Sequence, residues 1–96
     1  MEVYWTPEAI RDRTEVYEYI EARNPAAALT IDALFSEQAI QLADHPQSGR
    51  SGRVFGTQEV VVHKHYMMVY DISGDQVRVL NVVHTAKQWP VPDHLG

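Results

Sequence analysis

The chain has 96 residues, enough for one modest hydrophobic core, so we expect a single domain over residues 1–96. It contains no cysteine, which excludes a disulfide framework, a thiolate metal site and a cysteine nucleophile. The net charge of -5 is unevenly distributed: residues 1–47 hold three Arg and nine acidic residues, whereas residues 48–96 hold five Lys and Arg and four acidic residues. The chain as a whole therefore repels nucleic acid, and any contact with RNA or DNA would have to come from a local basic patch in the second half.

The first half predicts a short strand followed by two helices. Val3-Tyr4-Trp5 is apolar and β-prone, and Thr6-Pro7 is a helix start signal, because the threonine hydroxyl caps free amides and proline fits the first helical position. Asn24-Pro25 repeats this signal. Apolar side chains recur at helical spacing in both segments: Ile10, Val16, Tyr17 and Ile20, then Ala28, Ile31, Phe35 and Leu42. We expect an antiparallel helix hairpin, with Arg13 at the edge of the first apolar stripe.

The second half changes to a period of two, which indicates strands. We expect strands at Gln58–His63, Tyr66–Ile72 and Gln76–His84, with a turn at Ser73-Gly74-Asp75 between the last two. Their connections are too short for a parallel crossover, so the strands should form an antiparallel meander with the helix hairpin on one face.

Apolar residues occur at successive positions in these strands, so both faces of the sheet should be apolar. The core candidates are Val60, Val62, Met68, Val69, Val77, Val79, Leu80, Val82 and Val83. The face opposite the helices then needs a cover, which the C-terminal tail or a partner chain could supply.

Several short motifs, taken in order, resemble the RelE/ParE superfamily of toxins from bacterial type II toxin-antitoxin systems. They are W-T-P-E-A-I at Trp5 to Ile10, Y-I at Tyr19-Ile20, N-P-A-A-A at Asn24 to Ala28, P-x-x-G-R-x-G-R at Pro46 to Arg53, G-T-x-E at Gly56 to Glu59, V-Y at Val69-Tyr70, and V-L-x-V-x-H-x-A-x-x-W-P at Val79 to Pro90. The resemblance covers nearly the whole chain. It implies an α+β fold of β-α-α-β-β-β order, a growth-inhibiting toxin used in plasmid stabilisation, and a cognate antitoxin that wraps and blocks it.

The superfamily shares one fold but has two activities. RelE-like members cleave messenger RNA on the ribosome, and ParE-like members inhibit DNA gyrase. RNA cleavage needs cations for the phosphorane charge, and the RelE-like pattern places basic residues where this chain has Gln58, Val60 and Met67. Of the basic residues in that pattern, only Lys87 remains. The resemblance therefore favours the ParE-like branch.

Arg50 and Arg53 flank Gly52 on a glycine-punctuated loop, where their guanidinium groups could bind a carboxylate of the antitoxin or gyrase, or a phosphate. The competing interpretation is that they pair with the acidic helices and fix the loop. We expect the antitoxin to lie across the helix hairpin and near both arginines. The candidate antitoxin-binding or target-binding residues are Arg50, Arg53, Gln58, Lys87 and Trp89.

His84 ends the last strand and could act as a general acid or base, although a strand-end histidine is more often structural. The candidates for a nuclease are His84, Lys87, Arg50 and Arg53. His63 and His65 flank Lys64, which argues against a metal site and for a loop between strands. Trp89-Pro90 should anchor the tail over the sheet or contact a partner. We expect no cofactor and no metal.

The sequence therefore predicts a toxin that forms a hetero-oligomer with its antitoxin and inhibits gyrase. The alternatives are a ribosome-dependent endoribonuclease and an attenuated toxin that only binds its antitoxin. No basic segment precedes an apolar run near the N-terminus, and no apolar run approaches about 18 residues, so we expect a cytoplasmic protein without membrane contact.

Overall fold

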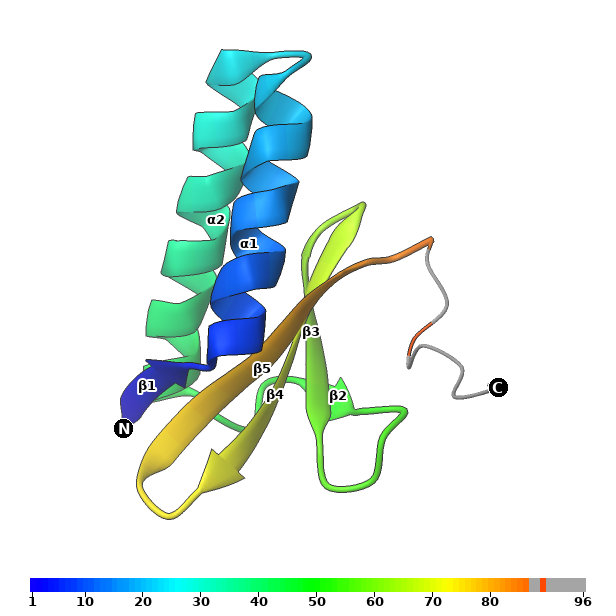
Figure 1. The fold of residues 1–96 in the computed structure, drawn as a ribbon. Coiled ribbons are helices and arrows are strands. Elements are labelled where there is room, and N and C mark those ends of the chain that lie inside the picture. Colours follow the sequence, from blue (N-terminus) through cyan, green and yellow to red (C-terminus); the bar gives the residue numbers. More distant parts are fainter. Residues whose placement is uncertain (87–88, 90–96) are drawn as a thin grey trace.

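The computed structural model describes residues 1–86 and 89. Two helices stand side by side as an antiparallel hairpin against one face of a twisted sheet (Figure 1). The elements in chain order are β1 (Glu2–Trp5), α1 (Pro7–Glu21), α2 (Pro25–Asp44), β2 (Arg50–Ser51), β3 (Gln58–His63), β4 (Tyr66–Ser73) and β5 (Gln76–His84). The predicted helix hairpin and the three predicted C-terminal strands are confirmed.

Both helices begin where the capping signals predict. The Thr6 side chain accepts a hydrogen bond from the Ala9 amide, and the Asn24 side chain accepts one from the Ala27 amide, each at 3.1 Å. Proline follows each cap at the first helical position, where its missing N–H costs nothing. The connection between the helices is therefore only three residues long, from Ala22 to Asn24.

The sheet has the order β1-β5-β4-β3-β2 and is mixed. β3, β4 and β5 form the predicted antiparallel meander, but β1 pairs parallel with β5, with Val3 opposite Val77. The antiparallel arrangement expected for the strands does not extend to this edge, because β1 and β5 are not joined by a short turn and residues 6–75 lie between them. β2 pairs with Gln58 and Glu59 in a segment that was expected to be loop.

The main core lies between the helices and the sheet. Phe35 and Leu42 of α2 pack there with Met68, Tyr70 and Val77 of the sheet. Two expectations about this core are corrected. Ile10 is 53% exposed because the buried face of α1 runs through Ala9 instead. Leu80 is only half-buried because a β-bulge opposite Val69 and Tyr70 displaces it from the regular register.

The edge of β5 beyond the end of β1 is closed by side chains. The Thr6 hydroxyl donates to the Leu80 carbonyl at 3.0 Å, and the Asp12 carboxylate accepts from the Val82 amide at 3.0 Å and from the Asn81 side chain. These contacts satisfy the backbone groups that β1 is too short to reach and attach α1 to the sheet.

In residues 1–86 and 89, no helix combines the length and the apolar character needed to cross a membrane.

Candidate functional site

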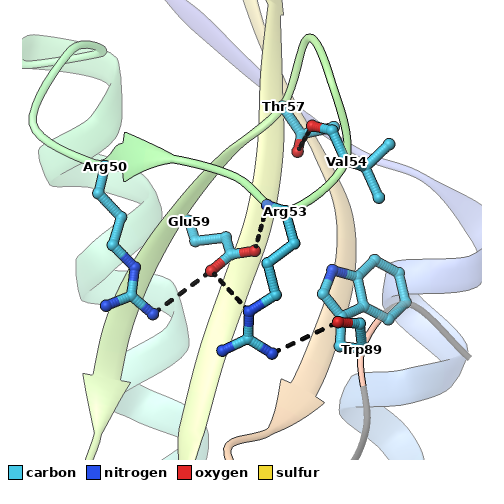
Figure 2. Close-up of polar contacts among 6 residues, drawn as sticks. All are labelled: Arg50, Arg53, Val54, Thr57, Glu59 and Trp89. Atoms are coloured by element: carbon cyan, nitrogen blue, oxygen red, sulfur yellow. Dashed lines mark hydrogen bonds and ion pairs between the residues drawn. The ribbon is translucent and has the colours of Figure 1, made fainter.

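The two arginines of the P-x-x-G-R-x-G-R motif meet at one buried carboxylate (Figure 2). Glu59 of β3 is 2% exposed, and its Oε1 lies 3.4 Å from Arg50 Nη2 and 3.9 Å from Arg53 Nε. Its Oε2 accepts a hydrogen bond from the Arg53 backbone amide at 2.9 Å. The competing interpretation, that these arginines pair with the acidic helices, is wrong about the partner, because a strand residue supplies the carboxylate.

The arginine side chains themselves remain accessible. The Arg50 side chain is 61% exposed and the Arg53 side chain is 46% exposed, whereas that of Glu59 is 1% exposed. Two cations on one buried anion leave a net positive charge at the surface. A guanidinium has five N–H donors, so each arginine can bind a second acceptor while it contacts Glu59.

Trp89 joins this cluster from the C-terminal segment. Its backbone carbonyl accepts a hydrogen bond from Arg53 at 3.4 Å, and its side chain packs on Met67, Val69 and Val83. These three residues form the second apolar cluster, on the sheet face opposite the helices. The prediction that Trp89 covers this face is confirmed; Pro90 lies outside the described residues. The Trp89 indole N–H is buried without a partner among residues 1–86 and 89.

The loop between β2 and β3 has a fixed shape. The Gly52 amide donates to the Thr57 carbonyl at 2.8 Å, and the Thr57 hydroxyl and amide both donate to the Val54 carbonyl, at 2.6 and 3.1 Å. A Cβ at Gly52 would collide with Thr57, and Gly56 has a φ of 86°, which glycine adopts without strain. The glycines therefore allow a compact turn.

Gln58 lies on the other side of β3 and does not join the arginines, because successive strand residues face opposite sides. Its Oε1 lies 2.7 Å from the Tyr70 hydroxyl and its Nε2 donates to Gln47 at 3.0 Å. The same hydroxyl accepts from the Gly49 amide at 3.0 Å and lies 2.8 Å from the Pro46 carbonyl. Gln58 and Tyr70 thus hold the segment that leads into β2.

His84 lies at the end of β5, in a cluster of aromatic rings. Its ring stacks on His65 with centroids 5.6 Å apart and meets Tyr66 edge-on at 5.2 Å. Its Nδ1 accepts a hydrogen bond from the Ala86 amide at 3.0 Å. His63 ends β3 and His65 follows in the turn, as predicted, and no group of three His, Cys, Asp or Glu residues in the described part of the chain could hold a metal ion. Lys87 lies outside the described residues.

A groove of about 670 Å³ runs between α1 and the end of β5. α1 contributes Asp12, Val16 and Tyr19 to it, and His84 and Trp89 form part of the opposite side. Its lining combines apolar side chains from β5, Val82 and Val83, with the acidic Asp12 and Glu15 of α1. A second groove of about 610 Å³ lies on another side of α1 and includes Ile10, Tyr17 and Glu18.

Comparison with known proteins identifies the family. Residues 3–89 match the family described as the ParE toxin of the type II toxin-antitoxin system parDE. The chain belongs to the ParE toxin family. It is therefore the toxin of a type II toxin-antitoxin module.

Two curated relatives of this ParE-family toxin agree with the assignment. The putative toxin Y4kP of Sinorhizobium fredii is 39% identical over 89 residues, which cover 92% of each chain. Toxin RelE2 of Caulobacter vibrioides is 29% identical over 86 residues, which cover 90% of this chain and 97% of that protein. Both relatives are named as toxins, and one of them carries the RelE name.

Solved structures share the fold of this ParE-family toxin. A structure of the chromosomal ParDE system of P. aeruginosa matches with a TM-score of 0.78 at 20% identity, covering 88% of this chain and 95% of that one. The heterotetrameric YoeB-YefM complex of Staphylococcus aureus matches with a TM-score of 0.61 at 10% identity and the same coverage. In this chain the β-α-α-β-β-β order implied by the resemblance is observed, with β2 as an additional strand.

Glu59 is the residue that sequence reasoning missed. It appeared only as the last letter of G-T-x-E, and a glutamate on a strand normally indicates a solvated position. Its position in the sequence could have indicated this role, because Glu59 is the one acidic residue between Ser48 and Tyr70, in a segment that contains two arginines. An acid with two nearby cations is a candidate for a buried ion pair in this ParE-family toxin.

Proposed function

We propose that this ParE-family toxin stops growth in the cytoplasm by binding DNA gyrase, without catalysing a reaction. The observation that supports this proposal is the position and the burial of Met67. It occupies a place where the RelE-like pattern has arginine, and it is 1% exposed in an apolar cluster that Trp89 covers. A nuclease needs preorganised cations at the phosphate, and a buried thioether cannot supply one.

The polar candidates are also held in place by contacts within the chain. Arg50 and Arg53 contact Glu59, and Arg53 also contacts the Trp89 carbonyl. His84 Nδ1 already accepts a backbone hydrogen bond and its ring stacks on His65. This arrangement favours a surface that binds a protein over a site that cuts RNA.

A supercoiling assay tests the proposal. Purified toxin added to DNA gyrase and relaxed plasmid should block supercoiling, and prior addition of the antitoxin encoded by the adjoining reading frame should restore it. Unchanged supercoiling at a large molar excess of toxin would contradict gyrase inhibition.

The alternative is a ribosome-dependent endoribonuclease in which His84 acts as acid or base. Its supporting observation is the cluster of His65, Tyr66 and His84 at the end of β5. This function predicts codon-phased cleavage of messenger RNA in a translating extract, lost in His84→Ala. If neither assay responds and the expressed chain leaves colony counts normal, an attenuated toxin that only binds its antitoxin is the remaining candidate.

We also propose that the antitoxin segment lies along the helix hairpin, as expected from the sequence, in the groove between α1 and the end of β5. This proposal replaces the expectation that the segment also lies near Arg50 and Arg53, which do not line this groove. Val16, Tyr19 and Tyr66 provide apolar contacts there, and Tyr19 is 58% exposed in the free toxin. Helical segments commonly bind such grooves through apolar anchors. Tyr19→Ala should weaken the toxin-antitoxin complex about tenfold or more in a binding titration, because exposed aromatic side chains often become anchors at interfaces.

A further inference from the structure

The tip of the loop between β2 and β3 presents an aromatic side chain to solvent. Phe55 is 102% exposed and its neighbour Val54 is 37% exposed. Phe55 thus buries nothing when the chain folds, whereas Phe35, the other phenylalanine, is 1% exposed in the core. A fully exposed phenylalanine contributes nothing to the core and is available as a contact for a partner.

The loop holds this side chain in place before any partner arrives. Its base is closed by hydrogen bonds from the Gly52 amide to Thr57 and from the Thr57 side chain to Val54, and its first turn is tied to Glu59 through the Arg53 amide. Figure 2 shows Val54 and Thr57 on the loop directly beyond Arg53 and Glu59. A loop that is ordered in advance loses little conformational entropy when it binds.

The charge next to the tip is positive. Figure 2 shows that the guanidinium groups of Arg50 and Arg53 lie on the same side of Glu59. Both are accessible and Glu59 is buried, so a partner meets the cations first. The helical half of the chain carries the opposite sign, because residues 1–47 hold nine acids and three arginines.

We propose that this loop is the surface with which the toxin binds its target protein: Phe55 enters an apolar pocket on the target, and Arg50 and Arg53 pair with carboxylates around that pocket. The proposal rests on the proposed function, that the toxin acts by binding a protein. A projecting side chain needs a concave partner, which a folded enzyme provides and a single antitoxin segment does not. An antitoxin segment instead requires a groove on the toxin, and the groove along α1 provides one.

The test compares three variants of the full chain in binding to purified DNA gyrase. Phe55→Ser should lower the affinity about tenfold or more, as expected for an aromatic anchor, and Phe55→Leu should lower it less. Leu29→Ser is the matched control, because Leu29 is 63% exposed on α2, away from the loop, and its affinity should stay within about twofold of wild type. All three should unfold at the wild-type temperature, since neither side chain is buried.

The same variants are titrated with the antitoxin encoded by the adjoining reading frame. Phe55→Ser should bind it as wild type does. If Phe55→Ser binds gyrase with wild-type affinity, or loses antitoxin binding to the same extent as gyrase binding, the loop is not a dedicated target surface and the proposal is wrong.

Colony counts separate this proposal from the assignment of gyrase. If the wild-type chain stops growth without binding gyrase, the proposed function is wrong. If Phe55→Ser then relieves that toxicity and Leu29→Ser does not, the result still supports the loop as the target surface. Toxicity that persists in Phe55→Ser overturns the proposal. Normal growth with the wild-type chain overturns both, because a protein without a target has no target surface.

Discussion

Glu59 combines a buried carboxylate with accessible cations. Its two oxygens contact two guanidinium groups and one backbone amide, so one side chain fixes both β2 and the start of the loop. Such a residue acts by positioning others, and its removal leaves two arginines close together without a counter-charge.

We predict that Glu59→Ala lowers the free energy of unfolding by about 2 to 4 kcal/mol, as is typical when one partner of a buried ion pair is removed. Glu59→Gln should lose about half as much, because its amide oxygen can still accept from the Arg53 amide. Urea denaturation at neutral pH measures both changes. A Glu59→Ala chain as stable as wild type would show that the loop does not depend on this carboxylate.

Tyr70 couples stability to alkaline pH. Burial raises the pKa of its phenol above the ordinary value of 10.0, and the hydrogen bond from the Gly49 amide offsets this rise in part. Burial, followed by the charge of Tyr19, also raises the pKa of Tyr66. The folded chain therefore holds these protons more tightly than the unfolded chain does.

The stabilisation from both phenols is accordingly complete below pH about 10 and is lost as the pH rises from there through the folded-state pKa values. We predict that the free energy of unfolding of the wild type falls with pH above about 10, and that Tyr70→Phe shows a shallower fall. Urea unfolding from pH 7 to pH 11 measures both slopes. Identical slopes would mean that Tyr70 ionises equally easily in the folded chain.

The two helices are joined by Arg13 as well as by apolar packing. Arg13 donates to both carboxylate oxygens of Asp32, at 2.7 and 3.1 Å, and to Ser36 at 2.6 Å, while its guanidinium lies 4.8 Å above the Trp5 ring. The side chain is 21% exposed, so it is packed between elements and does not extend freely into solvent. It thereby connects β1, α1 and α2.

We predict that Arg13→Lys lowers the free energy of unfolding by about 1 kcal/mol, because an ammonium group cannot reproduce the bidentate geometry or the stacking on Trp5. A double-mutant cycle with Asp32→Ala should give a coupling energy of about 1 kcal/mol, a value limited by the partial exposure of both side chains. Additive effects would contradict a direct interaction between the helices at this pair.

Local signals in the sequence were sufficient for most of the elements. Caps at Thr6 and Asn24 fixed the helix starts, and alternation fixed β3, β4 and β5. The parallel partner of β1 and the short β2 were not predictable, because pairing between distant segments depends on how the helix hairpin returns the chain to the sheet. For the same reason the sequence placed Arg50 and Arg53 together but did not identify Glu59 as their common partner.

At the scale of the whole molecule, the sheet is covered unequally. Two helices cover one face, whereas the cluster of Met67, Val69 and Val83 on the other face packs against Trp89 alone among its described apolar neighbours. The apolar residues on both faces of the sheet predicted that the face opposite the helices needs a cover, and Trp89 supplies it. This second apolar layer therefore depends strongly on one side chain.

We predict that Trp89→Ala lowers the free energy of unfolding by about 2 kcal/mol, less than for a fully buried tryptophan, and increases binding of an apolar fluorescent dye. Trp89→Phe should cost less than about 1 kcal/mol, because it keeps most of the apolar contact and removes an indole N–H that has no partner among the described residues. Urea unfolding and dye fluorescence measure the two effects. Unchanged dye binding in Trp89→Ala would mean that the face is covered by other means.

The parallel pairing of β1 with β5 has a consequence for how the toxin matures. Among the described strands β1 is synthesised before the others and β5 after them, yet each of Glu2, Val3, Tyr4 and Trp5 takes its partner from β5. A growing chain on the ribosome can form its helix hairpin early, but β1 has no partner until β5 has been synthesised. Premature termination before Gln76 should therefore yield a harmless, protease-sensitive fragment, and harm to the cell should begin only once synthesis has passed β5.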